Sequence, residues 1–263
     1  DGRPILPASL NVSEAATLVL AQVKEGREVR DLAKKLHLLV NTGYKGLVRS
    51  PTQGRKILDW GDGLKLTVLG PQDDQLTNLQ KAWDDKLKEL RAKGKPITSA
   101  YAADYLDQSV YNLSSLVVLA EVMGKRMLLT GEARGDFILE GLKAAGLLAN
   151  YTIHVDLLKV PDHGSDRDVD QEFFQQVTAD HYVISADGSN DNPDPDTLKW
   201  LSAARGKDSF TLHLTNRAGK KGLGPRLKAF FAREQKAGKK YRVIFRDTKD
   251  LSLTVDLLDK VAY

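Results

Sequence analysis

The spacing of apolar positions predicts helices and a strand in the first part of the chain. Residues 64–69 alternate apolar and polar side chains, as a half-buried strand does. Residues 72–93 place leucines three or four positions apart, which predicts a long amphipathic helix. Between residues 15 and 39, apolar positions recur at mixed helical spacing and indicate two shorter helical pieces. We expect residues 1–110 to form an irregular N-terminal part with helices and a hairpin.

A regular alternation of strand and helix patterns follows the polar connecting segment at 96–109. Residues 116–122 and 126–130 flank a short turn, which predicts a hairpin. Further helices are expected at 136–145, 170–177, 196–205 and 224–235, and further strands at 154–160, 182–185, 210–214, 241–245 and 251–257. Alternation of this kind indicates helices that cover a sheet. The predicted fold class is therefore α/β, with residues 1–263 forming one continuous body.

Composition narrows the kinds of site and compartment that the chain allows. The sequence contains no cysteine, which excludes disulfides and thiolate metal sites and leaves histidine and carboxylates as zinc ligands. The longest apolar runs have strand length, far below the roughly 20 residues of a membrane-spanning helix. The first residues lack the basic and then apolar pattern of a secretory signal. We expect a soluble protein without a membrane segment, with the cytoplasm favoured.

The charge balance is slightly basic. Lysine and arginine number 39 against 35 acidic residues, and part of the surplus falls in residues 217–240. Such a run is typical of a solvated amphipathic helix with flanking turns. The alternative is a patch that binds phosphate or nucleic acid, although the run lacks the interleaved exposed aromatic residues on which single strands stack.

Candidate chemistry falls on two turns that directly follow apolar strands. Glu132 comes after the strand that ends at Thr130-Gly131, and Asp162-His163 comes after the strand at 154–160. Turns at the carboxyl ends of neighbouring strands meet at one edge of a sheet, so we expect these two turns to lie side by side. Histidine nitrogen and carboxylate oxygen both bind zinc. Glu132, Asp162 and His163 are therefore candidate zinc ligands, the alternatives being a solvated carboxylate and a histidine that orients its own turn.

Neighbouring residues add few further candidates. Asp187 is a possible extra carboxylate ligand, while Arg134 and Lys159 flank the expected cleft and could meet an anionic substrate or form surface salt bridges. A catalytic zinc needs about three protein ligands and a structural zinc about four, so this chain could not hold two metals.

Several strings in their order along the chain resemble metallo-β-lactamase-fold hydrolases, in particular the branch related to the hydrolase-like domain of DNA-uptake channel proteins. The strings are NLSSLVVLAE, RMLLTGEARGD, HVDLLKVPDHGSDRD, ADHYVISADG and NPDPDTLKWL. The family strings usually read LLTGDA and LK-x-PHHGS. The resemblance implies an αββα sandwich with mixed sheets covered by helices, of which residues 111–263 would be the C-terminal half. It also implies zinc-dependent hydrolysis and places Glu132 at the position of the bridging aspartate.

The chain departs from that family at the ligands themselves. Glutamate replaces aspartate at position 132, aspartate replaces the first histidine at position 162, and the HxHxDH motif of the N-terminal half is missing. The histidines are widely spaced: His37, His154, His163, His181 and His213. For His181, a buried or strand-edge position is the favoured interpretation.

These departures lead to two hypotheses about function. The first is a degenerate or partial hydrolase, inactive alone, that serves as a binding, regulatory or processed subunit. The alternative is a zinc-dependent hydrolase of esters or phosphodiesters that is completed by an N-terminal half carrying HxHxDH. A lone half would expose an apolar sheet face, so the expected partner is that N-terminal half, another chain or a second copy in a homodimer.

Overall fold

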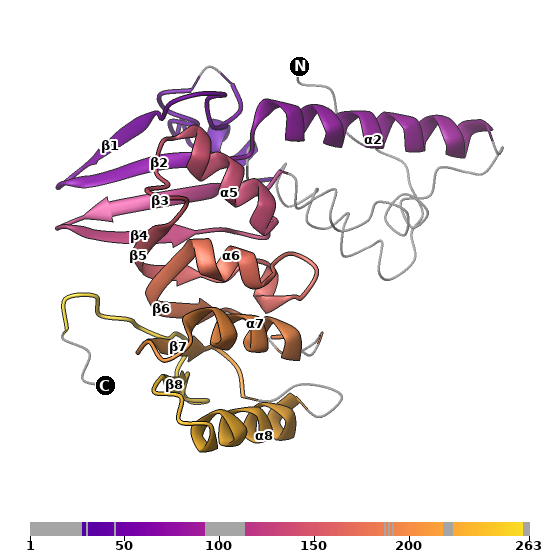
Figure 1. Ribbon diagram of the computed structural model, residues 1–263. Coiled ribbons are helices and arrows are strands. Elements are labelled where there is room, and N and C mark those ends of the chain that lie inside the picture. The colour runs from indigo at the N-terminus through magenta and orange to yellow at the C-terminus, as the bar shows by residue number, and fades with distance from the viewer. Residues whose placement is uncertain are drawn as a thin grey trace. The chain divides into compact units, whose positions relative to one another are not determined.

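The structure is a computed structural model that describes residues 28–29, 31–44, 46–92, 114–186, 188, 190, 192–217 and 223–259 (Figure 1). Contacts divide the chain into two compact units, Asp1–Val48 with Asp74–Leu113, and Arg49–Asp73 with Ser114–Tyr263. In the first unit, α2 (Asp73–Ala92) confirms the expected long helix, and residues 31–35 are also helical. The rest of the helical pattern at 15–27 lies outside the described residues. One continuous body over 1–263 stays a prediction.

The second unit, which we call the sheet unit, contains one eight-stranded sheet whose strand order equals the order in sequence. The strands are β1 (Ile57–Gly61), β2 (Leu64–Gly70), β3 (Val117–Val122), β4 (Lys125–Leu129), β5 (Ile153–Lys159), β6 (Val177–Ile184), β7 (Thr211–Leu214) and β8 (Arg242–Phe245). Strands β1 to β4 pair antiparallel, and β4 to β8 pair parallel. This mixed sheet confirms the α/β class.

Four helices connect the parallel strands. They are α5 (Gly135–Ala144), α6 (Gln171–Gln176), α7 (Pro195–Arg205) and α8 (Leu223–Lys236). Connections between parallel neighbours are almost always right-handed, and here each one advances in the same direction across the sheet. The helices therefore lie along one face of the sheet, as Figure 1 shows. None of the helices that the structure describes is long and apolar enough to cross a membrane.

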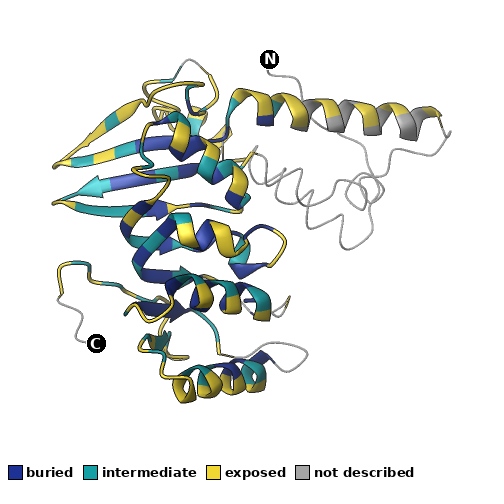
Figure 2. Cartoon of the chain, in the orientation of Figure 1, coloured by how far each residue is buried: buried dark blue, intermediate teal, exposed yellow. Residues whose placement is uncertain are grey.

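The core lies between this sheet face and the helices. The register aligns Leu119, Leu128, Leu158, Tyr182 and Leu212 across five strands, and each is almost completely buried. In Figure 2 buried residues, coloured dark blue, occur both along the strands and on the helices beside them. Burying one such side chain contributes about 1.5–3 kcal/mol. The apolar strand patterns thus account for most of the packing that holds the helices to the sheet.

The opposite sheet face is less deeply buried and carries both apolar and ionisable side chains. The next row of the register contains Leu66, Met127 and Leu157, which are half-buried, and the buried His181. In an adjacent row Leu129 is 41% exposed. The four helices of the sheet unit do not cover this face. It combines apolar side chains with a few ionisable groups.

Two histidines on that face form a buried pair. His181 Nδ1 lies 3.0 Å from His213 Nε2, and the two side chains are among the buried polar residues. Burial, together with the nearby charges of His181 and Arg242, lowers the pKa of His213 to about 4. Burial also lowers the pKa of His181, against the opposing effect of Asp180. The expectation of a buried His181 is confirmed.

Acid is expected to destabilise the sheet unit through His213. Its pKa is 6.5 in the unfolded reference and about 4 in the fold, so the unfolded chain takes up the proton first as the pH falls. The contribution is fully present above the unfolded value and is lost between there and about pH 4, by about 3 kcal/mol at most. Urea unfolding across this range should show a flatter pH profile for His213→Gln than for the wild type. Parallel profiles for the two proteins would contradict this role of His213.

One predicted strand is wrong, and one observed strand was not predicted. Residues 251–257 form no strand, and Leu251 is fully exposed. Arg246 donates to the carbonyls of Asp247 and Asp250 directly after β8, which turns the chain there. Conversely, β1 was not predicted, although Asp62 and Gly63, which link it to β2, both have the positive φ of a tight hairpin turn.

Candidate functional site

The two candidate turns lie side by side, as the sequence predicts. The first follows β4 and the second follows β5, its parallel neighbour. Thr130 Oγ1 donates to the Lys159 carbonyl at 2.6 Å, and the Asp162 backbone N–H donates to the Gly131 carbonyl at 3.4 Å. Glu132 and the Asp162–Gly164 turn are therefore held at the same edge of the sheet.

The second turn has an unusual backbone. Asp162, His163 and Gly164 have φ values of 38°, 55° and 81°, all in the left-handed region. Such conformations cost about 1–3 kcal/mol for residues with a side chain and persist only where the surroundings impose them. At Gly164 an added Cβ would also lie 2.8 Å from Pro193 Cβ. The surrounding structure therefore holds Asp162 and His163 in this conformation at a local cost in folding stability.

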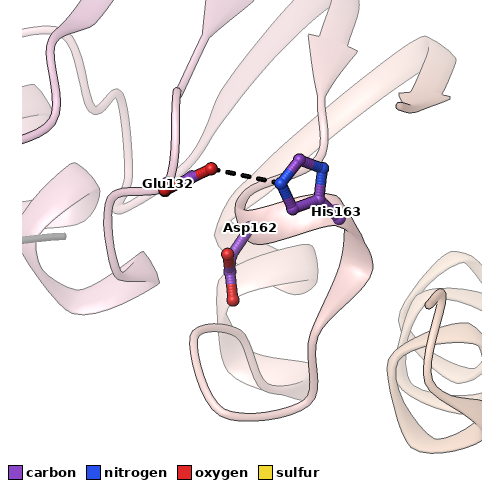
Figure 3. A group of neighbouring side chains, drawn as sticks. All are labelled: Glu132, Asp162 and His163. Carbon is purple, nitrogen blue, oxygen red and sulfur yellow. Dashed lines mark hydrogen bonds and ion pairs between the residues drawn. The ribbon is translucent and has the colours of Figure 1, made fainter. Parts of the chain in front are cut away.

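The three predicted ligands form one cluster, drawn in Figure 3. His163 Nε2 lies 3.1 Å from Glu132 Oε1, and one ligand atom from each of the three residues lies within 4.8 Å of the others. The side chains of Glu132 and His163 are 51% and 43% exposed. Over the described residues, this is the one group of three such side chains with metal-binding spacing.

His163 is placed as a donor at both ring nitrogens. Its Nδ1 lies 2.6 Å from the Ser185 carbonyl, which can only accept, and its Nε2 faces the Glu132 carboxylate. The hydrogen bond to Glu132 raises the pKa of His163, and the same bond lowers the pKa of Glu132. Without a cation the two side chains form an ion pair. The Ser185 carbonyl holds the Nδ1 proton, so that Nε2 is the nitrogen left to bind a metal.

Lys159 places a positive charge beside this cluster. Its Nζ donates to the Gly131 carbonyl, and burial lowers its pKa against the opposing effect of Glu132 and Asp162. This ammonium group offsets part of the negative charge of the two carboxylates. Arg134, by contrast, forms a surface salt bridge with Asp136 at 2.7 Å.

The donor set fits one divalent cation. One imidazole and two carboxylates are ligand types of catalytic zinc sites, which hold the metal with three protein ligands and keep one position open. Tetrahedral zinc bonds of about 2.1 Å place any two ligand atoms about 3.4 Å apart. Ligand atoms that lie within 4.8 Å of one another therefore have to approach by up to about 1.4 Å, which rotation of the three side chains can supply. Three donors do not suffice for two cations.

The remaining candidates do not join the cluster. His154 pairs with Asp180 at 3.4 Å, and His181 and His213 pair with each other. His37 belongs to the other unit. Asp187 lies outside the described residues.

A cleft whose lining the sequence did not indicate opens beside His163. It has a volume of about 430 Å³ and is bordered by Ser185, Asn192, Thr215 and Arg246. These residues follow the ends of β6, β7 and β8, so the order of strands brings them to the same edge as the cluster. The available signal was the position of Arg246 directly after an apolar strand. Comparisons with models of protein families, with curated proteins and with solved structures find no match for this chain.

Proposed function

We propose that the chain is a cation-binding, partial member of the metallo-β-lactamase-fold hydrolases that binds one zinc ion and does not hydrolyse substrates alone. Glu132, Asp162 and His163 are the proposed ligands. The observation that carries this proposal is the convergence of their ligand atoms within 4.8 Å from two hydrogen-bonded turns. The oriented Nδ1 of His163 supports it further, because ring orientation by a carbonyl is common at metal sites.

The arrangement of the sheet agrees with the C-terminal half of an αββα sandwich. Such a half has helices on one sheet face, while the other face packs against the second sheet. In this chain the four helices lie on one face, and the other presents half-buried apolar residues such as Leu66, Met127 and Leu157. An N-terminal half, another chain or a second copy would pack on that face.

We expect the chain alone to be inactive because it lacks the HxHxDH imidazoles that supply most of the metal ligands in the family it resembles. The cluster offers a single imidazole and no donors for a second cation. A bound zinc would lower the pKa of a coordinated water and so supply a nucleophile. Hydrolysis of esters or phosphodiesters is therefore the alternative function, favoured by the open fourth position and by the cleft beside His163. It requires the additional imidazoles of a complementary half.

Titration of the metal-free chain with zinc tests this proposal. We expect saturation at one zinc per chain by calorimetry, matched by elemental analysis after size exclusion, and no esterase or phosphodiesterase activity of the loaded chain. The size-exclusion step also shows whether the chain forms a homodimer, which would cover the exposed apolar sheet face. Absence of saturable zinc binding would overturn the cation site, whereas two zinc ions with turnover would replace the binding role by the hydrolase.

A further inference from the structure

The cleft beside His163 is rich in hydrogen-bond donors. Its described lining contains Asn190, Asn192, Arg246 and His163, whose side chains all carry N–H groups, together with Ser185, Ala186, Gly188 and Thr215. Among these described lining residues, Arg246 brings a permanent positive charge. A concave site with this lining favours a negatively charged ligand.

Arg246 is held in place by neutral groups. Its Nε donates to the Thr215 carbonyl at 3.0 Å, and its Nη1 donates to the carbonyls of Asp247 and Asp250. Backbone carbonyls do not cancel the positive charge, and within the described residues no carboxylate forms a salt bridge with Arg246. These contacts leave Nη2 as a donor for a ligand. Because the side chain is already ordered, binding costs little additional conformational entropy.

We propose that this cleft is a subsite for a phosphoryl group, with Arg246 as its anchor and the Asn190 and Asn192 amides as further donors. A guanidinium binds tetrahedral phosphate oxygens in a fork, and amides donate without adding charge. The volume of about 430 Å³ leaves room for an organic substituent on the phosphate, so the ligand class is a phosphate monoester or diester.

The position of the cleft relates it to the cation cluster. His163 belongs to both, because its ring pairs with Glu132 and also lines the cleft. A phosphoryl group on Arg246 would therefore lie next to the proposed zinc ligands. This link, which would make the cleft the substrate subsite of the zinc site, rests on the proposed function. Anion binding itself does not.

Phosphate binding to the metal-free chain tests the subsite. In the presence of a chelator, inorganic phosphate and phenyl phosphate should each bind saturably, as followed by calorimetry and by amide NMR shifts at Thr215. Arg246→Gln should weaken both by about tenfold or more, because a charge-assisted fork is lost. Arg242→Gln is the matched control, since Arg242 is an exposed arginine at the opposite end of β8.

A second variant tests whether Arg246→Gln weakens binding only because it disturbs the turn that Arg246 holds. Asn192→Asp adds a negative charge to the cleft without removing any contact of Arg246, and it should also weaken phosphate by about tenfold. Absence of saturable binding, or equal affinities in Asn192→Asp and Arg242→Gln, would overturn the subsite. Acetate binding as tightly as phosphate would overturn its phosphoryl selectivity. Loss of zinc binding with intact phosphate binding would refute only the proposed function.

Discussion

Replacing Gly141 with alanine is expected to destabilise the sheet unit by about 3 kcal/mol or more, beyond the usual range for an overpacked core. Gly141 lies in α5 where the helix contacts β2, and an added Cβ would lie 2.0 Å from the Leu69 carbonyl oxygen. Both partners are backbone, so no side chain can rotate away. Helix α5 would have to move off the sheet, although its Gly135 N–H is bonded to the Asp168 carbonyl at 2.6 Å.

Whether Gly141→Ala destabilises or stabilises the sheet unit is informative, because helix propensity alone would stabilise the variant. Alanine in a helix interior is favoured over glycine by about 1 kcal/mol, so a stabilised variant would show that α5 does not approach β2 as described. Urea unfolding followed by circular dichroism measures the change. Gly238→Ala is the control: Gly238 has φ +78° and no atom near its Cβ position, so only a backbone cost of about 1 kcal/mol is expected there.

Replacing His163 with alanine is expected to weaken zinc binding by about 100-fold or more. Loss of an outer partner of a metal ligand already costs about 10–100-fold, and His163 is the sole imidazole of the cluster. The variant also frees Glu132 from its ion pair, so the two carboxylates remain available but lack the nitrogen donor. Competition with a chromophoric chelator would measure the change in affinity.

His154→Ala provides a matched control for that measurement. His154 also faces a carboxylate, Asp180, with similar exposure, but among the described residues no third metal-binding side chain joins them. Its replacement should leave zinc affinity unchanged. The double variant Glu132→Asp and Asp162→His, which restores the family residues, should bind zinc more tightly than the wild type. Equal zinc affinities of His163→Ala and His154→Ala would show that zinc does not bind at the proposed cluster.

Much of the fold could be predicted because local patterns and tertiary contacts agree in the second half of the chain. The strand at Ile153–Lys159 and the helix at Pro195–Arg205 lie within one residue of their expected bounds. The prediction failed where pairing was decided by distant partners or by side-chain contacts. Strand β6 begins at Val177 rather than residue 182 because α6 passes directly into it. Residues 251–257 have an alternating apolar pattern but do not pair with a neighbouring strand.

For the candidate site, the sequence indicated the residues but not their interactions. Glu132 and His163 could be placed at one sheet edge because each follows an apolar strand. The proton shared between them depends on a 3.1 Å distance and on the Ser185 carbonyl, which belongs to a third strand end. Arg246 follows the end of a fourth strand, β8, and the strand order brings it into the same cleft as His163.

The agreement between strand order and sequence order has a consequence for how this protein folds. From β2 onward every strand pairs with the strand that precedes it, so each pairing closes a comparatively short loop, except that of β2 with β3, which are separated by residues 71–116. Loop-closure entropy rises with loop length, and topologies dominated by nearby pairings fold faster. The sheet can therefore grow strand by strand from its N-terminal edge while the chain is still being synthesised, with each helix docking as its strand is added.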